Sequence, residues 1–245
     1  MANLEHLALL KAGAVIWIEW RNKNPDIAPD LSNADLQGIN LSRMDLSHAS
    51  LLKANLCGAD FSGANLEKAI LAEAYLNTTN FSVANLSGAR LTQADLSDAN
   101  LIGSDLSHAN LKGATIADAN LIGTDLKGAN LRDADLGAAK LSRTNLCFAN
   151  LIEANLSEAD LSEANLYQAE MMGAYLYKAN LSKANLSKAH LNGAHLLYAN
   201  LSSANLTDAD LRWTNLRRAN LIGVKLQGAN LTGAALTKVN FETRD

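Results

Sequence analysis

From Leu31 to Phe241, a large apolar residue stands at every fifth position of the chain without a change of phase. There are 43 such positions; 38 hold Leu, and the others hold Phe61, Phe81, Ile116, Met171 and Phe241. In an α-helix, five residues turn through about 500°, so successive leucines would spiral around the cylinder instead of forming one stripe. In a straight strand, an odd spacing would send every second leucine to the opposite face. Neither regular element can bury this pattern.

The pattern is buried if the chain turns a corner every five residues, always in the same direction. The residue two before each central Leu is usually Ala, and the residue directly before it is usually Asn or Asp. We expect Leu and Ala to point inward, and Asn or Asp to occupy the corners, where their side chains can bond to nearby backbone. Glycines at outward positions, such as Gly58, Gly88, Gly113 and Gly128, are expected where the backbone angles are unusual.

Four such sides make a coil of twenty residues, and three make a coil of fifteen. With stacked coils about 4.8 Å apart, the four-sided geometry predicts about eleven coils and a rod of roughly 50 Å. Residues that break the Asn/Asp rule help to choose between the two. Ten of the twelve fall on two adjacent sides when they are sorted by a period of twenty, whereas they scatter over all sides with a period of fifteen, which favours four sides. They are Ser50, Ile70, Tyr75, Arg90, Thr115, Lys140, Glu170, Tyr175, His190, His195, Lys225 and Ala235.

Runs such as Ala154-Asn155-Leu156-Ser157-Glu158 resemble the A(N/D)LXX motif of the pentapeptide-repeat family. The resemblance covers Leu31 to Phe241, which is nearly nine tenths of the chain. It implies an all-β solenoid of the right-handed quadrilateral β-helix type. The family is especially abundant in cyanobacteria, and the segment before the repeats is similar to segments found in members from that group, so a cyanobacterial-type member is expected.

The two ends of the repeat differ. A β-helix leaves strand edges exposed at its ends, and residues 1–25 are predicted to be an α-helical cap on the β-helix of residues 26–245. Asn3 can cap a helix, and Asn24-Pro25 should end it. The expected buried face holds Leu4, Leu7, Lys11, Ala14 and Ile18, with Leu10 and Trp17 beside it. The alternative, an amphipathic helix that binds a membrane or a partner, lacks a basic polar face.

At the other end, only four residues follow Phe241 in the sequence, and they include no second cap. An open coil end can pair with the same end of a second chain. We therefore expect an end-to-end homodimer through the C-terminal coil, with Leu236 and Phe241 near the contact.

Composition limits the classes of partner. The 21 basic and 25 acidic residues give a formal net charge of −4, which argues against a nucleic-acid binder because such proteins need a basic surface. The two cysteines, Cys57 and Cys147, lie far apart in the repeat, and their scarcity fits a reducing compartment. The N-terminal apolar stretch lacks a basic leading region and a cleavage site, and no stretch reaches the length of a membrane span. A cytoplasmic protein without membrane or nucleic-acid partners is expected.

Catalytic motifs are not found. The sequence has no glycine-rich phosphate loop, no zinc-spaced Cys and His set and no nucleophile elbow. His48 and His108 share a column of the predicted rod, but three coils, about 14 Å, separate them, which is too far for one metal ion. A leucine-filled interior leaves no pocket. We therefore expect no enzyme activity, no cofactor and no metal.

The outward residues near the C-terminal end offer the best candidate for a binding site. Tyr, Trp and Arg gather there, which is the composition of binding hot spots, although aromatic columns also arise from packing between neighbouring strands. We call this set the candidate surface; it consists of Tyr175, Tyr177, His195, Tyr198, Arg212, Trp213, Arg217 and Arg218. It favours a rigid scaffold or regulator that binds a protein partner.

A second function follows from the family resemblance, since some members inhibit DNA gyrase or another topoisomerase by imitating DNA. That role needs a long negative surface. An acidic belt is present, but Lys178, Lys183 and Lys188 follow it directly and weaken the idea; the belt consists of Glu153, Glu158, Asp160, Glu163 and Glu170. Ice binding ranks last, because the outward rows mix Ser, Ile, Gly and charged residues instead of forming regular Thr rows.

Overall fold

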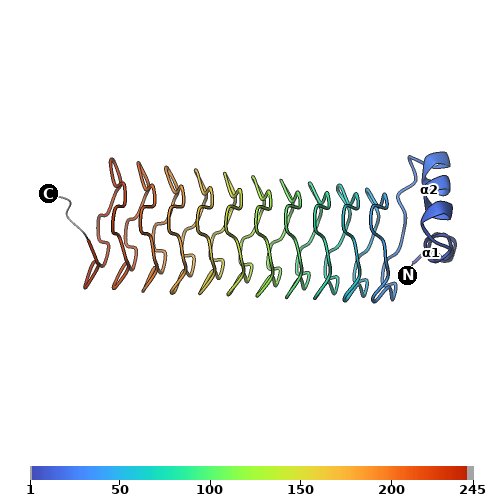
Figure 1. Cartoon of the computed structure of the whole chain (residues 1–245), viewed down its shortest axis with the longest axis horizontal. Coiled ribbons are helices and arrows are strands. Elements are labelled where there is room, and N and C mark those ends of the chain that lie inside the picture. Colours follow the sequence, from blue (N-terminus) through green and yellow to red (C-terminus); the bar gives the residue numbers. More distant parts are fainter. Residues whose placement is uncertain (1, 242–245) are drawn as a thin grey trace.

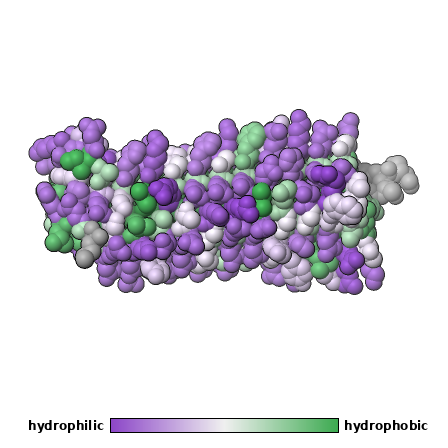
Figure 2. Space-filling view, turned by 180° about the vertical axis from the view of Figure 1, so that it is seen from behind, coloured by the Kyte–Doolittle hydropathy of each residue, from purple (hydrophilic) through white to green (hydrophobic). Residues whose placement is uncertain are grey.

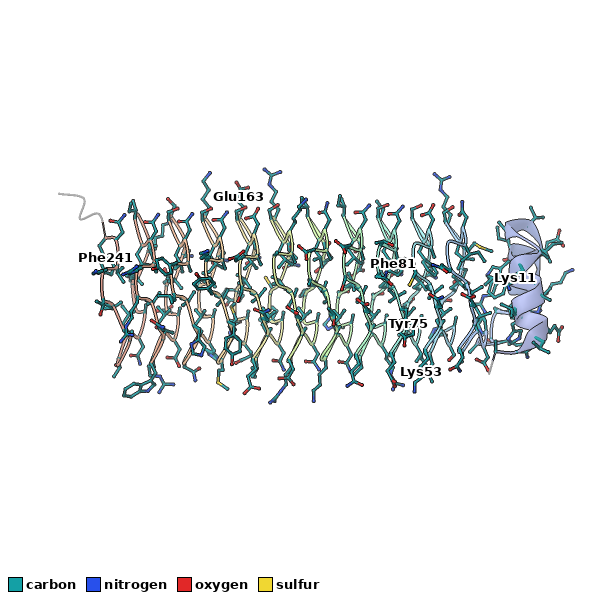
Figure 3. The ribbon with its side chains drawn as sticks, turned by 90° about the horizontal axis from the view of Figure 1, so that it is seen from below. Lys11, Lys53, Tyr75, Phe81, Glu163 and Phe241 are labelled. Atoms are coloured by element: carbon teal, nitrogen blue, oxygen red, sulfur yellow. The ribbon has the colours of Figure 1, made fainter. Side chains whose placement is uncertain are left out.

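The computed structural model describes residues 2–241, which form two short helices followed by a rod of stacked coils (Figure 1). Helix α1 (Leu4–Lys11) and helix α2 (Ala14–Lys23) lie across one end of the rod. Phe241 lies at the opposite end, as the labels Lys11 and Phe241 show in Figure 3. The chain therefore advances along one axis, and segments contact only the coils before and after them.

Parallel bridges hold neighbouring coils together in a register of twenty residues. The bridges recur at every fifth residue, from Asp30 paired with Ser50 to Asn220 paired with Asn240. Within residues 2–241, each strand is a single bridged residue between two turns, and no longer strand forms. Four five-residue units therefore separate each residue from its partner. The predicted four-sided coil is confirmed, and the fifteen-residue alternative is wrong.

The corners lie at the two outward residues of each unit, and not at Asn or Asp as the sequence analysis expected. In one such unit, the N–H of Met44 donates to the carbonyl of Leu41 across the turn, at 3.2 Å. The second outward residue of each unit has a positive φ, from 52° at Gln168 to 73° at Gly233, as a type II turn requires at its third residue. Glycine adopts this angle without strain, which explains its frequency at this position.

Asn and Asp occupy the bridged position, from which they stabilise the following turn. Asn40 accepts a hydrogen bond from the N–H of Ser42 through its Oδ1 atom, at 2.9 Å, and the same bond recurs along the rod. The predicted bond from Asn or Asp to nearby backbone is therefore confirmed. The predicted place of these residues at the corner is wrong, because the side chain acts on the turn from one residue before the central Leu.

We name the four sides after their first central residues: side A begins with Leu31, side B with Leu36, side C with Leu41 and side D with Leu46. From Leu31 to Leu221, the central residues are buried, and the Ala residues two positions earlier are buried with them. Phe61 and Phe81 stack in successive coils of side C, with ring centroids 5.1 Å apart; Phe81 lies inside the rod in Figure 3. This filled interior leaves only the outer surface for function.

Polar residues that replace the inner Ala are buried, and their hydroxyl groups form hydrogen bonds. Thr79, Thr124 and Thr144 each donate their hydroxyl to the carbonyl of a central Leu in the preceding coil, at 2.7–2.9 Å. Ser104 and Thr214 donate to the central Leu of the preceding unit, at 2.8 and 2.7 Å. A buried hydroxyl without such a bond would destabilise the fold, so these substitutions are compatible with the core.

Side-chain amides form ladders along sides C and D. Asn180 donates its amide N–H to Asp160 at 2.8 Å, Asn200 donates to Asn180 at 3.2 Å, and Asn220 donates to Asn200 at 3.1 Å. An amide suits this position because it can donate to one coil and accept from the next. Ten of the twelve departures from the Asn/Asp rule lie on sides A and B, where the ladder is interrupted by other side chains and only isolated amide bonds remain, such as that from Asn155 to Asp135.

The cap differs from the single helix that the sequence predicts. Gly13, with a φ of 105°, separates α1 from α2, while Asn3 caps α1 and Asn24 follows α2 as expected. The predicted buried face is wrong: Leu4, at the start of that face, is 80% exposed. The buried cap residues are His6, Leu10, Trp17 and Arg21. The break at Gly13 shifts the helical phase, so a face counted through both helices does not exist.

Trp17 and Arg21 attach α2 to the first coil. The indole N–H of Trp17 donates to the carbonyl of Asp45, at 2.8 Å. Arg21 is 7% exposed, forms an ion pair with Asp45 at 3.0 Å, and donates to the carbonyl of Ile27 at 2.7 Å. On the other helix, Nδ1 of His6 accepts the backbone N–H of Asp30, at 3.0 Å. The cap therefore combines apolar packing with directional bonds to the rod.

Acid should loosen this attachment. Burial of the Asp45 carboxyl opposes its ionisation, but hydrogen bonds from Ser47 and the charge of Arg21 outweigh burial and lower the pKa of Asp45. A carboxyl whose pKa is lower in the folded state contributes stability above its unfolded pKa, and this stability is lost as the pH falls through the folded pKa. Hydrogen exchange should therefore show α2 losing protection as the pH falls below the ordinary pKa of an Asp carboxyl, about 3.9.

Two variants give this pH experiment its controls. Asp45→Asn should lower the protection of α2 at pH 7 and flatten its pH dependence, because the charge of Arg21 then has no ionised partner. Asp98→Asn removes an exposed carboxylate from side B, far from the cap, and should behave like the wild type. Equal pH profiles for the wild type and Asp45→Asn would contradict the role of the ion pair.

Candidate functional site

Outward residues twenty positions apart lie in columns along the rod, because neighbouring coils pair in that register. Six residues of the candidate surface lie on side B, at the bridged position or the turn that follows it: Tyr175, Tyr177, His195, Tyr198, Arg217 and Arg218. Arg212 and Trp213 form the turn of side A that leads into side B. The eight residues therefore come from two adjoining sides and three successive coils.

The first part of the candidate surface is a stacked pair. The rings of Tyr175 and His195 have centroids 5.0 Å apart and planes inclined by 5°. These residues replace Asn or Asp at bridged positions of side B, so that two rings lie where an amide ladder would run. Tyr175 remains about half exposed. The stack therefore offers a flat aromatic face with a polar hydroxyl and an imidazole.

The second part lies at the neighbouring turn. Tyr177 and Tyr198 meet edge to face with centroids 6.1 Å apart, and the guanidinium of Arg218 lies 5.3 Å from the ring of Tyr198 and donates to its hydroxyl. Lys178 is not part of the candidate surface as predicted, but its Nζ atom lies 5.1 Å from the centroid of the Tyr177 ring. Cations over aromatic faces are attracted by the ring quadrupole. These contacts hold the two tyrosines in a fixed arrangement.

Arg212 and Trp213 are less closely tied to this group. The guanidinium of Arg212 pairs with Asp210 of side A at 2.7 Å, and its hydrogen bond lowers the pKa of Asp210. Trp213 is 69% exposed and lies across Gly233, where an added Cβ would come within 2.2 Å of the indole. The structure thus places a large exposed ring beside side B and directs the Arg212 charge toward side A.

A hollow that the sequence pattern does not predict adjoins the candidate surface on side B. It has a volume of about 330 Å³ and forms where Gly137 and Ala138 provide no long outward side chain. Tyr177 borders it on the side of the candidate surface, and carboxylates line its walls; the acidic residues are Asp118, Asp135 and Glu158. Gly137 and Ala138 do not stand out in the sequence, because small residues are common at outward positions. The hollow becomes predictable only when residues twenty positions apart are placed side by side.

Two carboxylates of the acidic belt, Glu158 and Glu163, form ion pairs with basic side chains. Glu158 pairs with Lys178 at 3.4 Å, and Glu163 pairs with both Arg143 and Lys183, at 3.0 and 3.9 Å. Each of these lysines lies twenty residues after the glutamate that it pairs with, so the ion pairs join neighbouring coils. The carboxylate of Glu170 lies 3.0 Å from Nδ1 of His190 on side A. These contacts interrupt the long negative surface that imitation of DNA would need.

The residues that the structure describes give little support for a metal site or for a reactive thiol. Among them, no group of three or more His, Cys, Asp or Glu side chains is placed to hold a metal ion. Cys57 and Cys147 are free thiols. Burial raises the pKa of Cys147, which disfavours the reactive thiolate form.

Exposed apolar residues lie at both ends of the rod as well as along it; those along it include Val83 and Phe148. Leu236 and Phe241 are exposed near the C-terminal end of the rod, where Phe241 is labelled in Figure 3. At the other end, Leu4, Val15 and Ile18 are exposed on the cap, where the space-filling view shows an apolar area among polar neighbours (Figure 2). In the described part of the chain, neither helix is long and apolar enough to cross a membrane.

Comparison with known families identifies the repeat. The sequence matches the family described as Pentapeptide repeats in eight copies, over residues 30–63, 59–98, 94–133, 129–168, 169–208 and 204–242. The chain belongs to the pentapeptide-repeat family. Members of this family form right-handed β-helices, which agrees with the predicted all-β solenoid.

Solved structures of the family include cyanobacterial relatives. HetL, a pentapeptide repeat protein involved in heterocyst differentiation regulation from the cyanobacterium Nostoc sp. strain PCC 7120, is 36% identical; the match covers 89% of this chain and 95% of HetL, with a TM-score of 0.37. Rfr23 from the cyanobacterium Cyanothece 51142 is 30% identical over 54% of this chain and 88% of Rfr23, with a TM-score of 0.29. These relatives agree with the predicted cyanobacterial type.

A third match is full-length QnrB1, a plasmid-mediated fluoroquinolone resistance protein. It is 18% identical, and the match covers 84% of this chain and 90% of QnrB1, with a TM-score of 0.46. A comparison with curated proteins gives no match.

Proposed function

We propose that this chain is a non-catalytic scaffold or regulator that binds a protein partner through the candidate surface. In this proposal, about eleven four-sided coils form a rigid rod in the cytoplasm, and sides A and B carry the contact residues. The observation that carries the proposal is the ordered group of Tyr177, Tyr198 and Arg218 on side B, next to the stack of Tyr175 on His195. Such rigid, partly exposed aromatic and Arg side chains are typical of binding hot spots.

The rigidity of the group supports this proposal over simple packing between coils. An exposed side chain must lose rotamer freedom when it binds, which costs about 0.5–1.5 kcal/mol for each immobilised side chain. Ring contacts and the bond from Arg218 to Tyr198 already hold several of these side chains in place. HetL, which is 36% identical to this chain, is a family member involved in regulation. On the basis of this sequence identity, we propose a regulatory role in general terms for this chain.

Capture experiments test the proposal. We expect the chain to retain a specific protein from a lysate of its source organism, and Tyr177→Ala/Arg217→Ala to reduce the amount retained by tenfold or more. That loss corresponds to about 1.4 kcal/mol, which is modest for two residues of a hot spot.

A matched control makes the same two kinds of substitution outside the candidate surface. Tyr75→Ala/Arg90→Ala removes one exposed Tyr from side B and one exposed Arg from side A, in coils near the cap. This variant should retain the partner as the wild type does. Equal retention by the wild type and by Tyr177→Ala/Arg217→Ala would show that this surface is not the binding site.

We also propose that the chain forms an end-to-end homodimer through its C-terminal coil. Leu236 and Phe241 expose apolar surface there, and Leu226 and Leu231 are only partly buried, unlike the central leucines of the inner coils. Light scattering at micromolar concentration should give twice the mass of one chain. Leu236→Glu should reduce that mass to one chain, whereas the same change at the outward neighbour, Thr237→Glu, should not. A wild-type mass of one chain would contradict the dimer.

A further inference from the structure

Charge changes sign along side B, and the candidate surface lies where it changes. Toward the cap, the turns of this side carry Asp98 and Asp118, both exposed. Toward the C-terminal end, they carry Arg217, Arg218 and Lys238, also exposed. Between them, Glu158 and Lys178 pair with each other and cancel. Side B therefore has an acidic section, a neutral aromatic section and a basic section, in that order along the rod.

The acidic section has a place for a single long side chain. The hollow over Gly137 and Ala138 has the carboxylates of Asp118 and Asp135 in its walls and the Tyr177 ring at its border, while the Glu158 carboxylate beside it is paired with Lys178. It has a volume of about 330 Å³ and is a shallow depression open to solvent, so a side chain would lie along it and not be enclosed by it. A lysine or arginine side chain suits it, because its alkyl part can lie along Tyr177 while its charge faces the carboxylates.

The spacing of the sections corresponds to a short extended peptide. Ala138 and Arg218 are eighty residues apart in one column, which is four coils or about 19 Å at the usual spacing of paired strands. An extended chain covers this distance in about six residues at roughly 3.3 Å each. The tyrosine section between them would face the middle of such a peptide.

We infer that side B binds an extended segment of the partner protein, with basic residues over the hollow, apolar residues over Tyr177 and Tyr198, and acidic residues over Arg217 and Arg218. This inference rests on the proposed function and specifies the chemistry of its partner. Complementary charge fixes which end of the segment lies toward the cap, and the aromatic section supplies apolar contact. A segment with evenly mixed charges would meet like charges at both ends.

Fluorescently labelled nonapeptides test the inference by anisotropy at low salt. One peptide has three lysines, three leucines and three glutamates in blocks, which places the centres of its charged blocks six residues apart. The other has the same nine residues with lysine and glutamate alternating. We expect the block peptide to bind at least tenfold more tightly, and its affinity to fall as salt is raised, because salt screens exposed charges. Equal binding of the two peptides would overturn the inference.

Variants of the rod localise the binding. Ala138→Lys should fill the hollow with a like charge and weaken the block peptide at least tenfold; Lys is tolerated at the same place in the repeat at residues 178 and 183. Arg217→Ser/Arg218→Ser should weaken it similarly. Arg143→Ser/Glu163→Ser, which removes an ion pair of side C, should leave binding unchanged. Unchanged binding to Ala138→Lys, in a variant that melts like the wild type, would contradict the place assigned to the basic residues.

The peptide experiment and the capture experiment can fail separately. If a protein is captured through Tyr177 and Arg217 but the rod does not prefer the block peptide, the inference about the partner segment is wrong and the scaffold function stands. If capture does not depend on Tyr177 and Arg217, the proposed function itself is wrong.

Discussion

Leu126→Asp is expected to unfold the coil that contains it and to lower the thermal midpoint of the whole rod. Leu126 is fully buried among central leucines and inner alanines of neighbouring coils. The substitution leaves a cavity, which costs about 2–5 kcal/mol in such sites, and adds a buried carboxylate without a partner. Circular dichroism during heating should show a midpoint lower by ten degrees or more, or no cooperative transition.

The neighbouring residue provides the control for this prediction. Lys127 is the first outward residue after Leu126 and is exposed. Lys127→Asp places the same carboxylate one residue away but in water, and should change stability by no more than about 0.5 kcal/mol. If Leu126→Asp melted like Lys127→Asp, the inward assignment of the central residues would be wrong.

Trp17→Ala is expected to detach the cap from the rod. The Trp17 side chain has 0% exposure, packs against Trp20 with ring centroids 5.2 Å apart, and bonds to the Asp45 carbonyl. Replacing a buried Trp by Ala costs about 3–5 kcal/mol, and the helices are too short to be stable alone. Hydrogen exchange should show α1 and α2 unprotected while the central coils stay protected, and the exposed coil end should promote association between chains.

Val15→Ala separates the effect of packing from the effect of helix composition. Val15 lies on the same helix as Trp17 but is 69% exposed, so its truncation should leave cap protection unchanged. Full protection of α2 in Trp17→Ala would mean that other contacts, such as Arg21 with Asp45, are sufficient to hold the cap.

The sequence predicts the coil well because a period of five admits few solutions. Leu at every fifth residue requires one turn per unit, and the clustering of twelve departures with a period of twenty selects four sides. The same reasoning cannot place the turn within the unit. Leu and Ala point inward whether the corner lies at Asn155 or at Ser157-Glu158, so the choice depends on backbone angles that the pattern does not encode.

The sequence predicts the cap and the candidate surface less completely, for different reasons. A single Gly13 changed the helical phase, so Leu4 and Ile18 are exposed while His6 and Arg21 are buried. On side B, the register of twenty brought the predicted aromatic residues together. It could not predict that Arg212 turns toward Asp210.

The central claim, that side B near the C-terminal end is the binding surface, is tested most directly by oxidative footprinting of the tyrosines with the captured partner bound. The chain has five tyrosines, and two of them, Tyr75 and Tyr167, lie outside the candidate surface. We predict that the partner lowers the oxidation rates of Tyr175, Tyr177 and Tyr198 severalfold and leaves those of Tyr75 and Tyr167 unchanged. Unchanged rates at the first three, with protection at either of the other two, would contradict the claim.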